Sequence, residues 1–420
     1  MDAVTRRKFL IASGVVGAGA LAAGAGALAW TDLHRAARAA PLAPGQGILV
    51  LLTLYGGNDG LNTVVPAADP AYQGARPGLA YTESEVLDLG DGLGLNPSMT
   101  GMHRLWQDGK LAIVRGVGYP NPNHSHFVSM DIWQTASPTD PETSGWLGRW
   151  LDAQPDDELR ALRAVSLGGT LPPLLAGAET AGSSLPLGQF RLPKGRLNTG
   201  LRALADSSNQ DNQYAAYAAK DTGDLFTVAA AFGSVLSAPT ASAGGTTGAS
   251  ASPSAKQGAA KSGGDLGRQL DIVASCIESS VPTQVYAVSL GGFDTHSAEK
   301  GTQSALLGEV SAAISAFQQR ISAGSRGQDV VLAAYTEFGR RVAANANEGT
   351  DHGTAGPVFV VGDSVSGGFV AEQPSLTDLD QGDLKFGTDF RSVYATLLAD
   401  VLRADPRQTL GAEFPLLPLR

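Results

Sequence analysis

Residues 47–54 of the chain read GILVLLTL, and residues 56–60 read GGNDG. A short, continuous apolar run that ends at turn residues predicts a strand buried on both faces, with a loop at its carboxyl end. Strands of this kind are typical of parallel sheets that are covered by helices. The segment therefore indicates an α/β fold with a loop at 56–60 on the carboxyl edge of the sheet.

Similar apolar runs recur along the chain, at 111–114, 284–290, 330–335 and 358–361. Patterns with helical periodicity lie between them, at 98–108, 265–279, 305–323 and 389–403. This alternation predicts an α/β protein with a mostly parallel central sheet and helices on both faces. Ligands of such sheets bind beyond the carboxyl ends of the strands, so the loops at that edge are the candidates for chemistry.

The first 40 residues have the pattern of an export signal. Residues 5–10 read TRRKFL, a Gly- and Ala-rich apolar stretch covers 11–30, and small residues precede Pro41. We interpret 1–40 as a twin-arginine signal peptide, which predicts a secreted, periplasmic or cell-envelope protein that meets the twin-arginine translocase during export. A retained membrane anchor is the alternative. The many Gly and Ala residues favour cleavage, so no stable membrane span is expected.

Composition excludes some classes of protein. The chain has 420 residues and a formal net charge of −10, and its mature region has no cluster of Lys and Arg, so nucleic acid is not expected as a partner. Cys276 is the single cysteine, which excludes an intrachain disulfide and a multi-cysteine metal site.

Residues 41–420 are predicted to form one domain. Residues 237–264 consist almost entirely of Ser, Thr, Ala, Gly and Pro and have no apolar periodicity, which indicates a disordered insertion. The alternative is a linker between two domains. Because candidate site residues lie on both sides of the insertion, a single interrupted domain is the simpler interpretation.

Acidic and histidine side chains gather in the predicted strand-end loops. Carboxylate oxygens and neutral imidazole nitrogens suit zinc and manganese, so their convergence at one edge predicts a site for one or two divalent ions. Each group is placed just past a predicted strand. Taken singly, Asp59 is better explained as a turn residue, and His352 is as readily a surface histidine as a ligand. The predicted ligands are Asp59, Asp294, His296, Asp351 and His352.

Three further residues are candidates for other roles. Glu337 is either a further ligand, an acceptor that orients a histidine, or a surface partner of a neighbouring arginine, Arg340 or Arg341. Ser125 is either a nucleophile, activated by a nearby metal, or the cap of a helix over 127–134. Arg115, after a strand, binds an anionic substrate or makes a structural ion pair.

These motifs resemble the DUF1501 family. The resemblance extends from about residue 47 to the end of the chain and rests on LYGGNDGLNT (54–63), SHF (125–127) with DIW (131–133), SGWLGR (144–149), GGFDTH (291–296), TEFGR (336–340) and TDHG (350–353). It implies the alkaline phosphatase/sulfatase superfamily, whose members share an α/β fold and usually bind two divalent ions. By resemblance, Asp59 matches the aspartate after the first strand and Ser125 the nucleophile region. Asp294 with His296, and Asp351 with His352, match the two metal half-sites.

The chain departs from that superfamily in two places. The Cys/Ser-x-Pro-x-Arg motif is absent, which disfavours a formylglycine sulfatase. No histidine follows His352, so the late histidine ligand found in alkaline phosphatases is missing. One metal position is therefore incomplete or filled by His124, His126 or Glu337. The expected function is a metal-dependent hydrolase of phosphate or sulfate esters, on a small molecule or a polymer. The alternatives are a non-catalytic secreted binding or assembly protein at the cell surface and, more remotely, a metal-assisted mutase.

Overall fold

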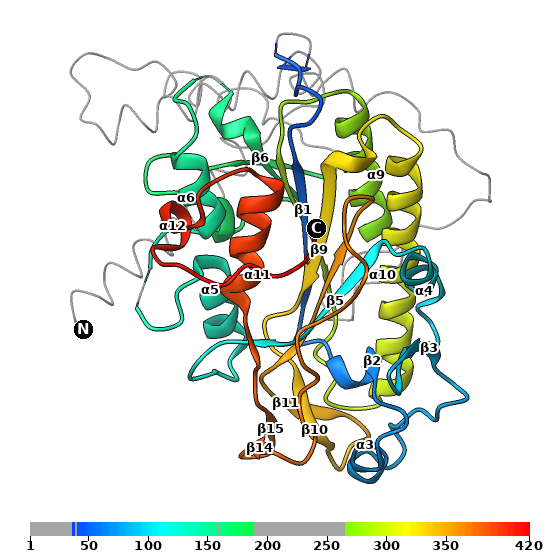
Figure 1. Ribbon diagram of the computed structural model, residues 1–420. Coiled ribbons are helices and arrows are strands. Elements are labelled where there is room, and N and C mark those ends of the chain that lie inside the picture. The colour runs from blue at the N-terminus through cyan, green and yellow to red at the C-terminus, as the bar shows by residue number, and fades with distance from the viewer. Residues whose placement is uncertain (1–35, 38–39, 141, 158, 188–264) are drawn as a thin grey trace, which may run out of the picture.

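The computed structural model describes residues 36–37, 40–140, 142–157, 159–187 and 265–420 (Figure 1). The predicted insertion at 237–264 and nearly all of the predicted signal peptide lie outside the described residues. Within the described ranges, no helix has the length and apolar character needed to cross a bilayer.

A nine-stranded sheet forms the centre of the fold. Its pairs are parallel except those of β12, which is antiparallel to both of its neighbours, β5 and β9. The predicted mostly parallel α/β fold is thus confirmed. In spatial order the strands are β13 (Gly368–Val370), β5 (Leu111–Gly118), β12 (Gly356–Val361), β9 (Val330–Tyr335), β1 (Ile48–Tyr55), β8 (Val285–Gly291), β6 (Ala164–Leu167) and β7 (Ser183–Leu185), and β16 (Thr388–Asp389) pairs with β5.

Helices cover both faces of the sheet, so alternate residues of β1 are buried in two separate cores. Val50 and Leu52 belong to a core with α4 (Thr100–Gln107), α9 (Asp265–Glu278) and α10 (Glu299–Ser322). Leu49 and Leu51 belong to the opposite core, with α5 (His126–Thr135), α6 (Trp146–Asp152) and α11 (Phe390–Thr396). Figure 1 shows the first group of helices to the right of the sheet and the second to the left. Burial on both faces explains why β1 is continuously apolar.

Two helices differ from their predicted bounds. Helix α10 begins at Glu299, not at 305. Its first turns bury polar side chains: Gln303 donates to Asn58 and to the Asp59 carbonyl in the loop after β1, so the apolar periodicity is missing there. Helix α11 continues as a π-helical turn over Leu397–Val401, which accounts for the longer predicted helix.

Small elements gather beyond the carboxyl edge of the sheet, at the bottom of Figure 1. They are the sheet of β2 (Val64–Val65), β4 (Leu93–Leu95) and β3 (Leu87–Gly90), the pair β10 (Arg340–Ala344) and β11 (Thr350–His352), the pair β14 (Leu379–Asp380) and β15 (Asp383–Leu384), helix α3 (Pro70–Ala75) and the 3-10 turn η1 (Gly60–Asn62). Most of them pack around a third, smaller core, whereas Leu89, Leu93 and Leu95 of β3 and β4 belong to the core with α4, α9 and α10. Helix α12 (Pro406–Leu410) packs near the chain end, against α6 and α11.

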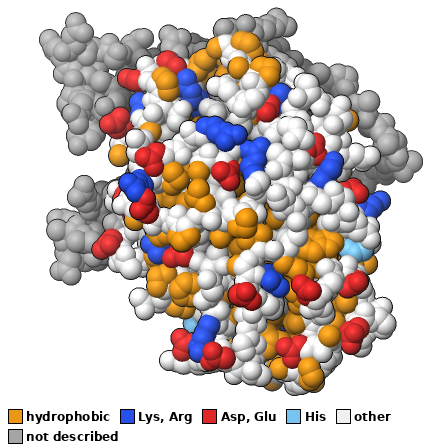
Figure 2. Space-filling model, in the orientation of Figure 1, with side chains coloured by type: hydrophobic (Ala, Val, Ile, Leu, Met, Phe, Trp, Pro, Cys, Tyr) orange, Lys and Arg blue, Asp and Glu red, His pale blue; other side chains and the backbone are white. Residues whose placement is uncertain are grey.

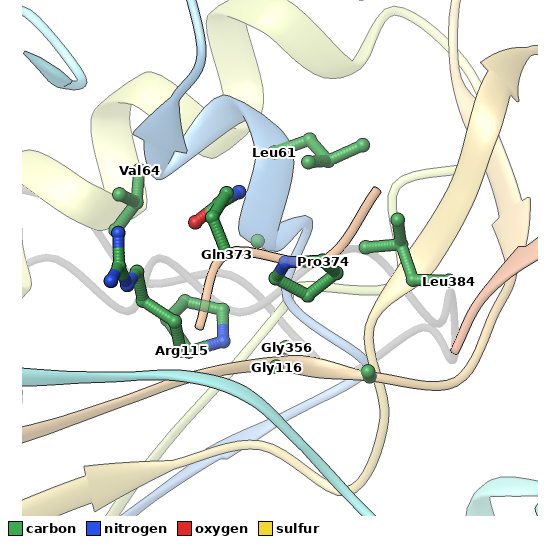
Figure 3. Close-up of a pocket in the computed structure, with 11 residues that line it drawn as sticks. Leu61, Val64, Arg115, Gly116, Gly356, Gln373, Pro374 and Leu384 are labelled. Carbon is green, nitrogen blue, oxygen red and sulfur yellow. The ribbon is translucent and has the colours of Figure 1, made fainter. Parts of the chain in front are cut away.

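The surface shown in Figure 2 mixes charges of both signs. Lys and Arg side chains are interspersed with Asp and Glu, and hydrophobic side chains lie between them. A pocket lies where η1 approaches the start of β12 and the segment after β13 (Figure 3). Arg115, from β5, lines this pocket together with Val64, Gln373 and Pro374.

Candidate metal centre

The carboxyl ends of β1, β8 and β9 lie side by side because these three strands are parallel neighbours. The segment with Asp351 and His352 reaches the same edge for a different reason. The sequence predicted this segment just past a core strand. In the structure it lies in β11, ahead of β12. Because β12 runs antiparallel, its beginning lies where its neighbours end.

Two glycines allow the loop after β1 to pass between its neighbours. Gly56 and Gly57 have positive φ angles of 118° and 68°. A Cβ atom on Gly56 would lie 2.4 Å from the backbone nitrogen of Asp294, and one on Gly57 would lie 2.3 Å from the ring of Phe338. Only glycine fits both the backbone conformation and the space. The GG pair therefore sets how closely the three loops approach one another.

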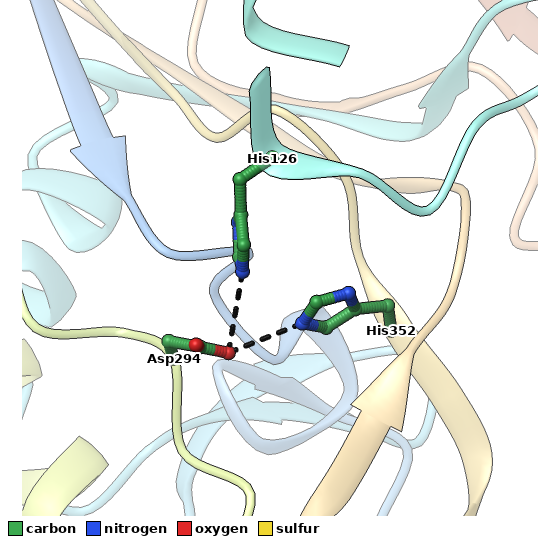
Figure 4. Close-up of side chains that lie close together, drawn as sticks. All are labelled: His126, Asp294 and His352. Atoms are coloured by element: carbon green, nitrogen blue, oxygen red, sulfur yellow. Dashed lines mark hydrogen bonds and ion pairs between the residues drawn. The ribbon is translucent and has the colours of Figure 1, made fainter. Parts of the chain in front are cut away.

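Three histidines converge on one carboxylate oxygen, Oδ1 of Asp294. The Nε2 atoms of His126, His352 and His296 lie 3.4, 3.2 and 3.0 Å from it. Figure 4 shows His126 at the start of α5 and His352 at the end of β11 pointing at Asp294 in the loop after β8. A zinc ion with bonds of about 2.0–2.1 Å places its tetrahedral ligand atoms about 3.3 Å apart. The ligand atoms of His126, Asp294 and His352 all lie within 4.8 Å of one another, which fits a single coordinated ion. His296 is not part of this group, although its Nε2 contacts Asp294 and His352.

The opposite nitrogen of each ring faces an acceptor. Nδ1 of His126 lies 2.8 Å from Oε1 of Glu337, and Nδ1 of His352 lies 2.7 Å from the carbonyl oxygen of His124. Nδ1 of His296 lies 3.5 Å from Oδ1 of Asp351. A carbonyl only accepts, so Nδ1 of His352 carries the proton and its Nε2 keeps a lone pair. Metal-binding histidines have this arrangement, in which an acceptor fixes the tautomer.

His126 provides a direct test of whether a cation fits the cluster. Its Nε2 atom is buried and has no hydrogen-bond partner among the described residues. An unpartnered buried nitrogen costs free energy. A divalent ion would remove that cost, so the residues present fit a metal.

The charges of the cluster suit a cation at neutral pH. Burial acts to raise the pKa of Asp294, but the hydrogen bond and positive charge of Arg340, together with the neighbouring histidines, outweigh it and lower that pKa to about 2. Burial lowers the pKa of His352 in spite of its contact with Asp294. The cluster thus offers an ionised carboxylate and a neutral imidazole, which are the forms that bind metals.

Glu337 is buried and holds the cluster in place. Its Oε1 accepts a hydrogen bond of 2.9 Å from the backbone N–H of Gly56 in addition to its contact with His126. It is therefore not a surface partner of the arginines that follow it. Arg340 instead donates to Asp294, at 2.8 Å. Sequence reasoning missed Arg340 as a site residue; its only signal was its place in the TEFGR motif.

Asp59 lies outside the cluster. Its carboxylate forms a fully buried, two-bonded ion pair with Arg76, in which Nη2 lies 3.0 Å from Oδ1 and Nη1 contacts Oδ2. Its Oδ1 also caps η1 by accepting from the N–H of Leu61. Burial acts to raise the pKa of Asp59, but Arg76 outweighs it and the pKa is lowered. Both carboxylate oxygens of Asp59 are thus engaged. The structure places this predicted metal ligand in a turn, where it pairs with Arg76.

The remaining predicted residues are divided between the cluster and its surroundings. Ser125 is the N-cap residue of α5, next to His126, but its side chain makes no capping hydrogen bond. The imidazole of His124 turns away to Asp383, with Nε2 2.8 Å from Oδ2, while its carbonyl holds His352. Arg115 lies elsewhere, in the pocket of Figure 3, where its Nε donates to the Ala371 carbonyl at 2.9 Å.

These observations define a class: an α/β protein with a His/Asp cluster suited to a divalent cation at the carboxyl edge of its sheet. The sequence profile of the family described as "Protein of unknown function (DUF1501)" matches residues 48–409. The chain therefore belongs to the DUF1501 family. None of the curated protein sequences compared with the chain is significantly similar to it.

Several solved structures resemble the chain distantly. A protein in the alkaline phosphatase superfamily from Vibrio parahaemolyticus has 9% identity and a TM-score of 0.37, with 93% of this chain and 81% of that chain covered. The C-terminal periplasmic domain of EcEptC from Escherichia coli, in complex with Zn, has 8% identity and a TM-score of 0.33 (77% and 78% covered). The lipoteichoic acid synthase LtaP from Listeria monocytogenes has 8% identity and a TM-score of 0.30 (75% and 65% covered). At these values the likenesses define neither a substrate nor a metal for this chain.

Proposed function

We propose that the protein is an exported, metal-dependent hydrolase of phosphate or sulfate esters. The observation that carries the proposal is the convergence of three imidazole Nε2 atoms on Oδ1 of Asp294, with the opposite nitrogen of each ring facing an acceptor. An arrangement of this kind at the carboxyl edge of a mostly parallel sheet lies where α/β proteins bind their ligands.

The ligand set differs from the one expected from sequence. His126, Asp294 and His352 would hold the ion, with zinc or manganese as the metals that suit these donors. His296, which contacts Asp294 and His352, would lie beside them. Asp351 would orient His296, and Glu337 would orient His126. Asp59 has no place in this set, so the proposal is for one ion. When bound, the ion would supply positive charge that polarises an anionic ester and stabilises its oxygens during attack.

Ser125 is the proposed nucleophile. It directly precedes His126, and its hydroxyl is free of the capping bond that was its alternative role. In the proposed reaction its Oγ forms a bond to phosphorus or sulfur, the bond to the ester oxygen breaks, and the hydroxyl proton passes to the departing alcohol. Water then releases the phosphate or sulfate. The substrate is an anionic ester on a small molecule or a polymer.

Export rests on the TRRKFL motif at residues 5–10 and the apolar stretch that follows it. Passage through the twin-arginine translocase would place the folded protein in the periplasm, the cell envelope or the medium. This route suits the proposed metal site, because the ion can be inserted before export.

A second candidate function is a non-catalytic binding or assembly protein at the cell surface. One observation favours it: Phe127, directly after His126, is 89% exposed. An exposed aromatic ring beside the cluster suits contact with a partner. In that case the ion would be structural or would bridge to the partner.

The test begins with metal content per chain, measured by elemental mass spectrometry on protein purified without chelators. We expect about one equivalent of zinc or manganese in the wild type and in the control His103→Ala, because His103 lies away from the cluster and contacts the Asp88 carbonyl. Asp294→Ala should lose the metal.

Hydrolysis is then screened with aryl phosphate and aryl sulfate esters. Ser125→Ala should keep the metal and lose turnover. A metal-free wild type after reloading would contradict the proposed centre. A loaded protein that hydrolyses neither ester would support the binding function.

A further inference from the structure

A second recess lies at the carboxyl edge, on the sheet face that packs against α5. The register places Thr53 beside Ser289 and Ser166 beside Ala287 on this face. Nearer the middle of the same face, Leu51 is packed in the core. Toward the edge the side chains become small, and a cavity of about 330 Å³ opens between the sheet, α5 and the segment before η3 (Pro173–Leu175).

The lining of this cavity is polar but carries no charged side chain among the described residues. Hydroxyl and amide groups come from Thr53, Tyr55, Gln134, Ser166 and Ser289. Several keep free hydrogen-bonding capacity: Thr53 donates to Tyr335 at 3.0 Å, which leaves its oxygen lone pairs, and Gln134 reaches the hydroxyl of Tyr55 only at 3.5 Å.

Ser166 gives the lining of the cavity a buried hydroxyl without a hydrogen-bond partner among the described residues. The residue is 3% exposed, lines the cavity, and its Oγ has no hydrogen-bond partner among the described residues. A buried hydroxyl without a partner costs about 1–3 kcal/mol, and an apolar side chain would avoid that cost. The hydroxyl of Ser166 is therefore a group to which a polar occupant of the cavity, water or ligand, can bond.

We infer that this cavity binds a neutral, polyhydroxylated molecule of the size of one sugar ring or cyclitol. The volume lies in the range of small-molecule sites, about 300–1,000 Å³. Hydroxyl groups of a ligand pair with hydroxyl and amide groups of the protein, whereas a charged ligand would be buried without a counter-charge.

The cavity adjoins the candidate metal centre through the end of β1. Tyr55 lines the cavity, and the N–H of the next residue, Gly56, bonds to Glu337, which holds His126. The two sites are thus neighbours on one edge, although binding in the cavity needs no metal ligand. A neutral sugar or cyclitol could therefore arrive free or as part of a larger substrate.

The test is isothermal titration calorimetry with D-glucose, D-galactose and myo-inositol, against D-glucuronate and D-glucosamine as charged counterparts. It is run on the full mature chain, once metal-loaded and once after chelation. We expect at least one neutral compound to bind in both states, and its charged counterparts to bind at least about 10-fold more weakly.

Two variants locate the binding. Ala287→Leu should abolish it by filling the cavity, and Ser166→Val should weaken it about 3- to 10-fold by removing one hydrogen bond. Ser184→Val, at the β7 position paired with Ser166 but outside the cavity, is the matched control and should bind as the wild type does. Urea unfolding checks that each variant is folded.

Three results would overturn the inference: no neutral compound binds the wild type, Ser166→Val binds with unchanged affinity, or a charged counterpart binds more tightly. Free methyl glycosides and the same sugars as phosphate monoesters separate the two sources of the ligand. Sugar binding is measured directly, and also without metal. A result that disproves the hydrolase proposal would therefore leave the evidence for sugar binding unchanged.

Discussion

The Nε2 atoms of His296 and His352 lie 2.9 Å apart, and both lie within 3.2 Å of Oδ1 of Asp294. The Nδ1 proton of His352 is committed to the His124 carbonyl, so its Nε2 presents a lone pair to the other ring. Two facing lone pairs repel unless a proton or a cation lies between them. A proton on Nε2 of His296 makes this contact an ordinary hydrogen bond, whereas with both rings in the tautomer that binds metals only a cation relieves the repulsion.

Glu337→Gln tests the support of the cluster. The amide oxygen still accepts a hydrogen bond from His126, but the negative charge that raises the basicity of the imidazole is lost. We expect metal affinity to fall about 10- to 100-fold, measured by competition with a chromophoric chelator. Glu372→Gln, on the exposed surface, is the control. Equal affinity in Glu337→Gln and the wild type would remove Glu337 from the metal site.

Arg340→Met tests the hydrogen bonds that hold the loops together. The buried guanidinium donates to the carbonyls of Gly57 at 2.6 Å, Thr350 at 2.9 Å and Phe293 at 3.2 Å, so it ties the ends of β1 and β8 to β11. Leaving these acceptors unpaired should lower the free energy of unfolding in urea by about 3–5 kcal/mol. Arg341→Met, at a partly exposed side chain, should cost less than about 1 kcal/mol. Similar losses in both variants would contradict the role given to Arg340.

Asp59→Asn separates a structural role from a ligand role. The substitution leaves Arg76 buried without its counter-charge, and we expect a loss of about 3–5 kcal/mol in the free energy of unfolding. The metal content of the folded fraction, measured after gel filtration, should equal that of the wild type. A drop in metal content in properly folded Asp59→Asn would restore Asp59 as a ligand.

Glu299 predicts how stability changes with pH. Burial and the nearby charge of Asp59 raise the pKa of Glu299 from 4.5 to about 9. The folded protein keeps this proton in a range of pH where the unfolded chain has released it. The stabilising contribution of Glu299 is therefore fully present below about pH 4.5 and is lost as the pH rises through about 9.

We expect the wild type to lose stability relative to Glu299→Gln between pH 5 and pH 9, measured by urea unfolding at intervals across that range. The comparison cancels the titration of the histidines, which both proteins share. A difference in stability that stays constant over this range would show that Glu299 titrates normally.

Local patterns in the sequence were sufficient for the strands and for part of the site. The continuous apolar run at Ile48–Tyr55 required burial on both faces, and the DTH motif placed Asp294 and His296 after a strand. His126 was less distinct, since nothing local separates it from His124. The structure separates them because His126 begins α5 with its ring turned inward, whereas the ring of His124 bonds to Asp383.

The sequence alone determined the α/β class, the family resemblance and the edge of the sheet at which polar residues gather, because strand burial and turn composition are local properties. Only the tertiary structure decided which of those residues meet. Asp59 and Asp294 follow neighbouring parallel strands, yet one is paired with Arg76 and the other faces three histidines. That difference depends on contacts between distant parts of the chain, where the loops of β1, β8 and β9 pack against β11 and α5.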